Sequence, residues 1–259
     1  IIKRGSLAVS GATGRGLTPI LDRCARLGVP LRLAGNGRPY RARLREAGWQ
    51  GIVIDAVTPD AELAGLQVGL LGGHQAQNAA VALAVLDALR QDAARRGQPL
   101  TGLDESAIRR GLAAARWPGR MELLSETPVG LVLLDGAHNP AGARALARAL
   151  EELEVKDVPM VIGATRGKRV TAMLRALAAR RPRPVFTAID EPRAMPPAAL
   201  LAAWHRAAPG IAADTAPDVG AALARAAGMR REPSQPVVVA GSLYLVGAAR
   251  ELLAGEAAA

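Results

Sequence analysis

The sequence predicts an α/β protein whose second half is a doubly wound, mostly parallel sheet. Apolar stretches of strand length alternate with polar loops and helical patterns, which is typical of a parallel sheet covered by helices on both faces. The expected strands are 131–134, 158–163, 185–189 and 236–240. Parallel strands end at one edge of a sheet, where open α/β sheets bind ligands. The loops after these strands therefore hold the first candidate functional residues.

The first half combines two kinds of structure. A strand at 7–10, a helix from Thr18 to Leu27 and a strand at 29–33 predict a β-α-β unit with a parallel crossover. Short alternating stretches from Tyr40 to Leu71, punctuated by turn residues, predict a small antiparallel ribbon.

Two helices complete this half. The first runs from His74 to about Arg90, and its part at 79–89 is almost wholly apolar, so we expect it to be buried. The second, at 104–115, ends before Pro118, because proline disfavours helix in the residue before it. We place the domain boundary here. The expected domains are 1–116 and 117–259.

Composition narrows the function classes. The chain has 259 residues, half of them hydrophobic, which is enough for two domains with cores. A single cysteine, Cys24, excludes an internal disulfide and a cysteine-based metal cluster. No apolar run has the length of a membrane span, and the basic start is not followed by a signal-peptide core. We expect a cytoplasmic monomer without a membrane partner.

The formal net charge of +10 comes almost entirely from arginine. Nucleic-acid binding is one interpretation. Aromatic residues make up only 2% of the chain, however, so platforms for base stacking are scarce. The arginines are scattered over helix faces near acidic residues. A solvated basic surface is the favoured interpretation, attraction of small polyanionic substrates is the second, and we expect no nucleic-acid partner.

The segment from Gly11 to Thr18 nearly matches a phosphate-binding P-loop. It has the glycine spacing, the terminal threonine and the strand-loop-helix context. Leu17, however, occupies the position of the lysine that contacts the β- and γ-phosphates. We therefore expect a plain glycine turn here.

The stretch from Trp117 to Gly142 holds the main candidate residues. The strand at 131–134 is followed by Asp135 and His138, and then by a helix N-terminus. Upstream, Arg120 closes a Trp-Pro-Gly-Arg turn, which would mount a guanidinium rigidly enough to hold a phosphate.

Each of these residues also has a structural interpretation. Asp135 could only cap the following helix, and His138 could be a solvent-facing loop residue. Arg120 could only pair with Glu122 or Glu126.

A second polar group opens the helix that begins near His74. His74 and Asn78 are four residues apart and Gln75 and Asn78 are three apart, so they share a helix face. Helix capping with satisfied buried amides and ligand recognition near the positive helix end explain this group equally well.

Four motifs together resemble the folylpolyglutamate synthase/dihydrofolate synthase family of Mur-ligase-like amide ligases. They are LGGHQAQNA at 71–79, WPGRME at 117–122, DGAHNP at 135–140 and GSLYLVG at 241–247. Each motif is modest alone, but their order is specific and they span most of the chain.

The resemblance implies what the two domains are. Residues 1–116 would be a remnant of a P-loop ATPase-like domain, the C-terminal part of the central ATP-binding domain. Residues 117–259 would be the Rossmann-like, C-terminal glutamate-ligase domain. The opening IIKRG resembles a segment well inside the family's full-length proteins. The true P-loop and the Mg²⁺ ligands are therefore expected upstream, and this chain is expected to be inactive alone.

Residue roles follow from the same resemblance. Asn78 would contact the adenine side of ATP, and Asp135 would bind the nucleotide at the ribose. Arg120 would reach the phosphates and, with His138, form the catalytic pair, while His138 and Ser242 would line the same cleft. Lys168 is not proposed, because its loop at 165–169 is basic and lacks the family's acids. No metal ligand is expected in this chain.

The implied reaction is ATP-dependent addition of L-glutamate to a folate or dihydropteroate carboxylate through an acyl phosphate. Phosphoryl transfer needs cations around its spreading negative charge, and Arg120 is the candidate cation here. The alternatives are a fragment of a cell-wall Mur ligase, or a non-enzymatic nucleotide-binding or scaffold protein, since the P-loop lysine is missing.

Overall fold

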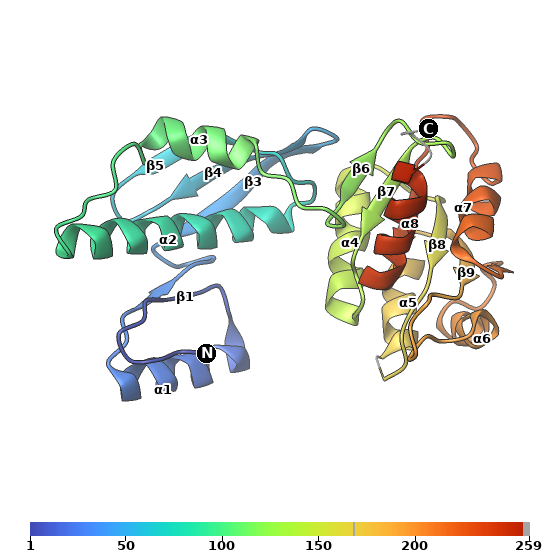
Figure 1. The fold of residues 1–259 in the computed structure, drawn as a ribbon, viewed down its shortest axis with the longest axis horizontal. Coiled ribbons are helices and arrows are strands. Elements are labelled where there is room, and N and C mark those ends of the chain that lie inside the picture. The colour runs from blue at the N-terminus through green and yellow to red at the C-terminus, as the bar shows by residue number, and fades with distance from the viewer. Residues whose placement is uncertain (168, 256–259) are drawn as a thin grey trace. The chain divides into compact units, whose positions relative to one another are not determined.

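The computed structural model describes residues 1–167 and 169–255, and it divides into two compact units (Figure 1). The units are Ile1–Ala115 and Arg116–Ala259, so the division lies one residue before the expected boundary. Each unit is considered by itself. Among the described residues, no helix combines the length and apolar character needed to cross a membrane.

The first unit opens with the expected β-α-β arrangement. Strands β1 (Ala8–Ser10) and β2 (Leu31–Leu33) are parallel neighbours, and helix α1 (Thr18–Leu27) joins them. Gly28, at φ +64° in the left-handed region, ends α1, as glycine does at many helix C-termini. The predicted bounds of this helix are confirmed.

The loop between β1 and α1 shows why it is rich in glycine. A Cβ on Gly11 would lie 2.9 Å from Val81 Cγ2 and 3.0 Å from Gln77 Nε2, both on helix α2 (His74–Arg95). Gln77 also donates a hydrogen bond to the Ala34 carbonyl after β2 (3.1 Å). Close packing on α2 therefore requires glycine at position 11, independently of any phosphate.

The antiparallel ribbon is also present. Its strands are β3 (Arg41–Gly48), β4 (Gly51–Val57) and β5 (Glu62–Val68). Alternate β4 residues such as Ile52 and Ile54 pack with α2 and α3 (Glu105–Ala113) in one core. Only part of the apolar surface of α2 meets this core, since Val85 and Leu89 are exposed. The expectation of a fully buried helix at 79–89 is therefore wrong.

The second unit contains a six-stranded sheet with the order β10-β9-β8-β11-β7-β6. All neighbours are parallel except β6 and β7. The strands are β6 (Glu122–Leu124), β7 (Val132–Asp135), β8 (Pro159–Ile162), β9 (Arg183–Thr187), β10 (Asp214–Ala216) and β11 (Val237–Ala240). The mostly parallel sheet is confirmed, whereas the edge strands β6 and β10 were not predicted. Each has three residues, too few to show a periodic pattern.

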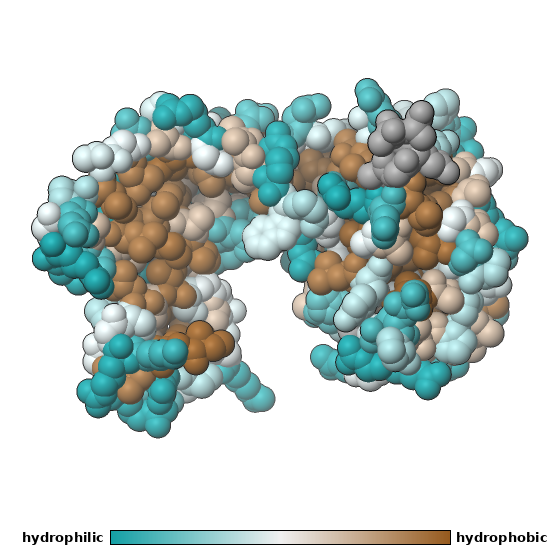
Figure 2. Space-filling model, viewed as in Figure 1, coloured by the Kyte–Doolittle hydropathy of each residue, from teal (hydrophilic) through white to brown (hydrophobic). Residues whose placement is uncertain are grey.

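Five helices cover the two faces of this sheet. They are α4 (Pro140–Glu152), α5 (Val170–Ala178), α6 (Pro197–Ala207), α7 (Val219–Gly228) and α8 (Leu243–Gly255). Helices α7 and α8 share a core with one face, while α4, α5 and α6 pack side by side. Hydrophobic residues from the sheet and from α7 and α8 form one core. On the face shown in Figure 2, hydrophobic areas of this unit are bordered by hydrophilic residues. The chain is thus doubly wound.

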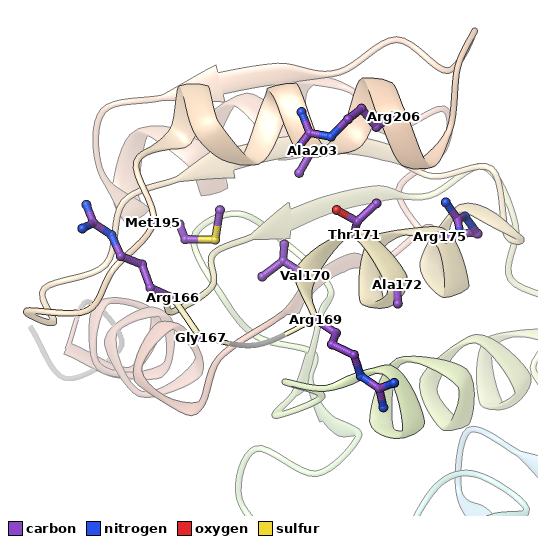
Figure 3. A pocket seen from close by; sticks show the side chains of 10 residues that line it. All are labelled: Arg166, Gly167, Arg169, Val170, Thr171, Ala172, Arg175, Met195, Ala203 and Arg206. Atoms are coloured by element: carbon purple, nitrogen blue, oxygen red, sulfur yellow. The ribbon is translucent and has the colours of Figure 1, made fainter.

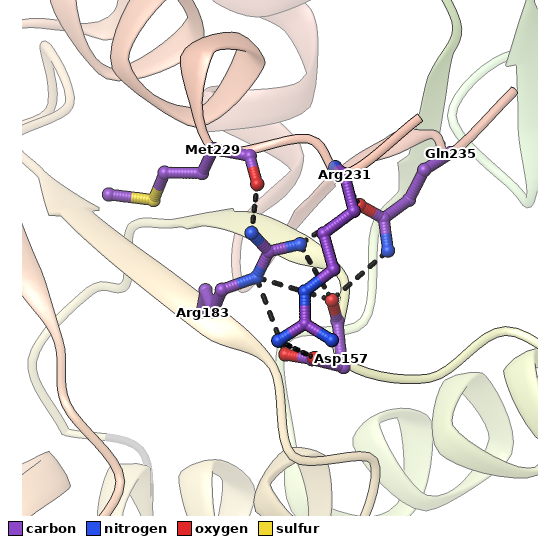
Figure 4. A network of polar contacts seen from close by, with 5 residues as sticks. All are labelled: Asp157, Arg183, Met229, Arg231 and Gln235. Carbon is purple, nitrogen blue, oxygen red and sulfur yellow. Dashed lines mark hydrogen bonds and ion pairs between the residues drawn. The ribbon is translucent and has the colours of Figure 1, made fainter. Parts of the chain in front are cut away.

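At the amino end of the sheet, Arg183 ties three segments together (Figure 4). Its guanidinium donates to the carbonyls of Asp157 (2.8 and 3.2 Å) and Met229, and to Gln235 Oε1 (2.9 Å). Partial burial lowers the pKa of this guanidinium from its ordinary value. Arg183 therefore joins the loop before β8 to the loop before β11.

We expect Arg183→Met to destabilise the second unit by about 1–3 kcal/mol, because it leaves partly buried carbonyls without a donor. Chemical denaturation followed by circular dichroism measures this loss. Arg231→Met is the control, since the exposed Arg231 makes one ion pair with Asp157 (2.5 Å) and such pairs contribute at most about 1 kcal/mol. Equal losses in the two variants would contradict the role given to Arg183.

Candidate functional site at the carboxyl edge

The Trp-Pro-Gly-Arg turn is a rigid mount for Arg120. The Arg120 N–H donates to the Trp117 carbonyl (3.1 Å), and Gly119 adopts φ +69°, the positive φ that position i+2 of a type II turn requires. A Cβ on Gly119 would lie 2.8 Å from Val246 Cγ1 on α8. The turn is therefore pressed against α8, and no larger residue fits at position 119.

Asp135, the last residue of β7, joins this turn to the loop that follows the strand. Its carboxylate is buried, with Oδ2 accepting the Met121 N–H (3.0 Å) and Oδ1 accepting the Ala137 N–H (2.9 Å). Gly136 N–H in turn donates to the Gly119 carbonyl (2.8 Å). These bonds fix two segments that lie 14 residues apart in the chain.

The Arg120 side chain is half-buried and lies against Gly136. A Cβ built on Gly136 would collide with Arg120 Nη1. Within residues 1–167 and 169–255, no hydrogen bond or ion pair engages this guanidinium. Glu122 instead accepts from the Gly119 N–H (2.8 Å) and pairs with Arg250 (3.1 Å). The interpretation of Arg120 as a structural partner of Glu122 is therefore wrong.

His138 sits in the same loop and is half-buried rather than freely exposed. Its Nδ1 lies 2.9 Å from the Gly136 carbonyl oxygen. Because a carbonyl only accepts, Nδ1 carries the proton in this contact. In the neutral ring, Nε2 is then left as an acceptor.

The cap of α4 is Asn139 rather than Asp135. Asn139 Oδ1 accepts the N–H groups of Ala141 (3.0 Å) and Gly142 (2.9 Å), and Pro140 occupies the first turn. The interpretation of Asp135 as a helix cap is therefore wrong, and its carboxylate serves the Arg120 turn instead.

Ser242 reaches the same edge from β11. Its side chain is buried, and Oγ accepts the Tyr244 N–H at the start of α8 (3.2 Å). The preceding Gly241 N–H donates to the Ala137 carbonyl (2.9 Å), which joins the exits of β11 and β7. The structure thus brings Arg120, Asp135, His138 and Ser242 together. The neighbouring Leu243 and Tyr244 expose their side chains.

Asn78 lies in the first unit, in the first turn of α2. Its Nδ2 donates to Gln75 Oε1 (2.8 Å), and Gln75 Nε2 lies 3.1 Å from His74 Nε2. The N-cap residue, Gly73, provides no side-chain cap. The polar side chains of this turn therefore bond to one another, and Gln75 is the buried member.

The loop after β9 was expected at this edge, but no role was assigned to its residues. Arg193 donates from Nε to Glu191 Oε1 (2.9 Å), and its pKa is raised first by this hydrogen bond and charge, and then by Tyr244. The Arg193 carbonyl accepts the Arg166 N–H (2.7 Å), which ties the loop after β8 to this one. An acid-Pro-Arg triplet after a strand was the available signal. Lys168, in the loop after β8, lies outside the described residues.

The donor set of this edge suits an anion better than a cation. It offers the unengaged guanidinium of Arg120, which carries donors and no acceptor. In the part of the chain that the structure describes, no group of three His, Cys, Asp or Glu side chains is placed to hold a metal ion.

Comparison with known proteins identifies the second unit. Residues 123–252 match the family model described as dihydrofolate synthetase, C-terminal domain. A folylpolyglutamate synthase of Lacticaseibacillus casei is 35% identical over 197 residues, which cover 76% of this chain and 42% of that protein. The chain thus spans less than half the length of this relative.

Two further matches extend this result. The crystal structure of Mycobacterium tuberculosis folylpolyglutamate synthase complexed with ADP and AMPPCP is similar with a TM-score of 0.80 and 29% identity, covering 96% of this chain and 56% of that one. A UDP-N-acetylmuramoyl-L-alanyl-D-glutamate–2,6-diaminopimelate ligase of Corynebacterium efficiens is 32% identical over 224 residues, 82% of this chain and 39% of that protein. The family model, which matches half of the chain, and the fold agree: the chain belongs to the dihydrofolate synthetase C-terminal domain family.

Proposed function

We propose that the longer protein containing this chain is an ATP-dependent ligase that adds L-glutamate to a folate or dihydropteroate carboxylate. Residues 1–116 would complete its central ATP-binding domain, and residues 117–259 would be its glutamate-ligase domain. The single observation that carries the proposal is the unengaged Arg120 guanidinium, held against Gly136 in the loop that also carries His138, in a chain from this family.

Arg120 suits a phosphate ligand for two reasons. A guanidinium binds phosphate oxygens through two parallel N–H groups, and this one is mounted on a turn fixed by Asp135. ATP supplies the phosphoryl group that makes the carboxylate reactive toward an amine. A positioned cation stabilises the negative charge that spreads over the phosphoryl oxygens, and no rearrangement is needed when reaction occurs.

The other residues would surround the same substrate. His138 Nε2 can accept a proton or a hydrogen bond from a bound group, and we give it the second catalytic role. We propose that Asp135, whose carboxylate accepts the N–H groups of Met121 and Ala137, lies close to the ribose of the bound nucleotide. Ser242 would line the nucleotide site of the second unit, where its side chain is buried and bonds to the start of α8. In the first unit, considered by itself, we propose Asn78 as a contact for the adenine of ATP.

Magnesium completes the proposal without ligands from this chain. We propose that the reaction uses Mg²⁺ with ATP, and that the protein acts as a cytoplasmic monomer without nucleic-acid or membrane partners. A Mur-type ligase is the second candidate, favoured by the match that covers 82% of this chain. An assay of the full-length enzyme with pteroate-type carboxylates and with UDP-sugar peptide carboxylates distinguishes the folate ligase from the Mur-type ligase by which substrate is used.

We expect Arg120→Ala in the full-length protein to lower kcat for glutamate addition by about 10²–10³-fold, as loss of one transition-state charge contact does. ATP-dependent incorporation of radiolabelled glutamate measures the change. Thermal unfolding should hardly move, because the guanidinium has no partner among the described residues.

Arg148→Ala is the matched control for this substitution. Arg148 is exposed on α4, and its removal should leave both turnover and stability unchanged. If Arg120→Ala lost stability in proportion to activity, the proposed phosphate contact would be wrong and Arg120 would be structural.

We also expect Gly136→Ala to impair the enzyme by displacing Arg120, since the added Cβ would collide with Nη1 and with Leu243. The predicted result is a raised KM for ATP and a kcat lowered at least tenfold, with the fold retained. Gly247→Ala on α8 is the control, because a Cβ there meets open space. Wild-type kinetics for Gly136→Ala would show that the position of Arg120 does not matter.

A further inference from the structure

A hollow of about 600 Å³ lies between α5 and α6, outside the site described above (Figure 3). Four arginines line it: Arg166, Arg169, Arg175 and Arg206. Val170, Ala172, Met195 and Ala203 provide apolar surface, and Thr171 adds a hydroxyl. Among the described residues that line it, none is acidic and none is aromatic.

Several other arginines of the second unit have a counter-charge. Arg180, Arg193 and Arg225 each pair with a nearby carboxylate. For the four arginines of the hollow, no ion pair or side-chain hydrogen bond is found among residues 1–167 and 169–255. Four like charges gathered without counter-charges repel one another, so the arrangement favours an anion that binds among them.

The positions of the side chains indicate the form of this anion. Arg166 lies at one end of the hollow and Arg175 with Arg206 at the other, whereas Arg169 points away from them (Figure 3). The first turn of α5 lies between these ends. It holds no acidic residue and no side-chain cap, so its N–H groups add positive potential. An anion with negative groups along its length would have a partner at each end.

We propose that this hollow binds a linear oligoanion, a flexible small molecule with several carboxylates or phosphates along its length. Guanidinium groups bind both kinds of group, and the apolar wall accommodates the methylene or ester backbone between them. A γ-linked glutamate chain has this chemistry, and in that form the inference rests on the proposed ligase function. An inorganic polyphosphate has the same chemistry, and its binding does not depend on the ligase function.

The test measures binding by the chain of residues 1–259 with isothermal titration calorimetry at low salt. The probes are penta-γ-glutamate and tripolyphosphate, without ATP or folate. Saturable binding of either probe at one site is expected. The probe that binds more tightly shows whether the site prefers a chain of carboxylates or a chain of phosphates.

The variant Arg175→Gln/Arg206→Gln should weaken this binding at least tenfold, because each lost contact is charge-assisted. Arg144→Gln/Arg148→Gln is the matched control, as it removes two exposed arginines of α4 that lie outside the hollow. This control should bind within about twofold of wild type, and circular dichroism confirms that both variants fold.

Three results would overturn the proposal: no saturable binding of either probe, equal loss in the two double variants, or preference for a single-stranded oligonucleotide of equal charge. Glutamate incorporation by the full-length protein is assayed separately. An active ligase whose isolated chain binds neither probe would refute the oligoanion site alone. An inactive full-length protein that still binds tripolyphosphate would refute only the ligase function.

Discussion

The buried carboxylate of Asp135 is the interaction on which the candidate site depends. It accepts one N–H from the turn that carries Arg120 and one from the loop that carries His138. Burying a carboxylate is costly unless its oxygens are hydrogen-bonded, and charge-assisted bonds are about twice as strong as neutral ones. The bonds that stabilise the carboxylate therefore also fix the spacing of the two segments, and the main-chain bond from Gly136 to Gly119 reinforces this constraint.

This constraint determines how Arg120 can act. A surface arginine loses considerable side-chain freedom when it binds a phosphate, and that loss reduces affinity. Arg120 is already confined by the Trp-Pro-Gly turn and by contact with Gly136. The glycines at 119 and 136 are needed because α8 and the guanidinium occupy the space of a side chain. The Arg120 side chain is thus held in place before any ligand binds, by the geometry of the turn and by the space that glycine leaves at positions 119 and 136.

The sequence predicts the elements better than it predicts the contacts. The helix at 18–27 was placed correctly because Gly28, which ends it, is visible in the sequence. The strand β6 was missed because three residues show no periodicity, and this omission concealed the partner of Asp135. The Met121 N–H reaches the carboxylate only because β6 pairs with the end of β7. Arg120, Asp135, His138 and Ser242 were expected at one edge of the sheet and are found there. The hydrogen bond from Met121 to Asp135, however, depends on the register between β6 and β7.

The ion pairs and hydrogen bonds of each arginine distinguish structural arginines from candidates for ligand binding. The net charge of +10 does not make this distinction. Arg183, at the amino end of β9, donates to main-chain carbonyls on two neighbouring loops, and its charge is offset by Asp157. Arg120, at the opposite edge, has no such partner among the described residues, although Glu122 lies two residues away. Glu122 bonds to Gly119 and Arg250 instead, so the local acid stabilises the mount and leaves the guanidinium available. A guanidinium whose neighbouring carboxylate is engaged by other donors keeps its own N–H groups available to an anion, and this holds for Arg120 whichever anion binds there.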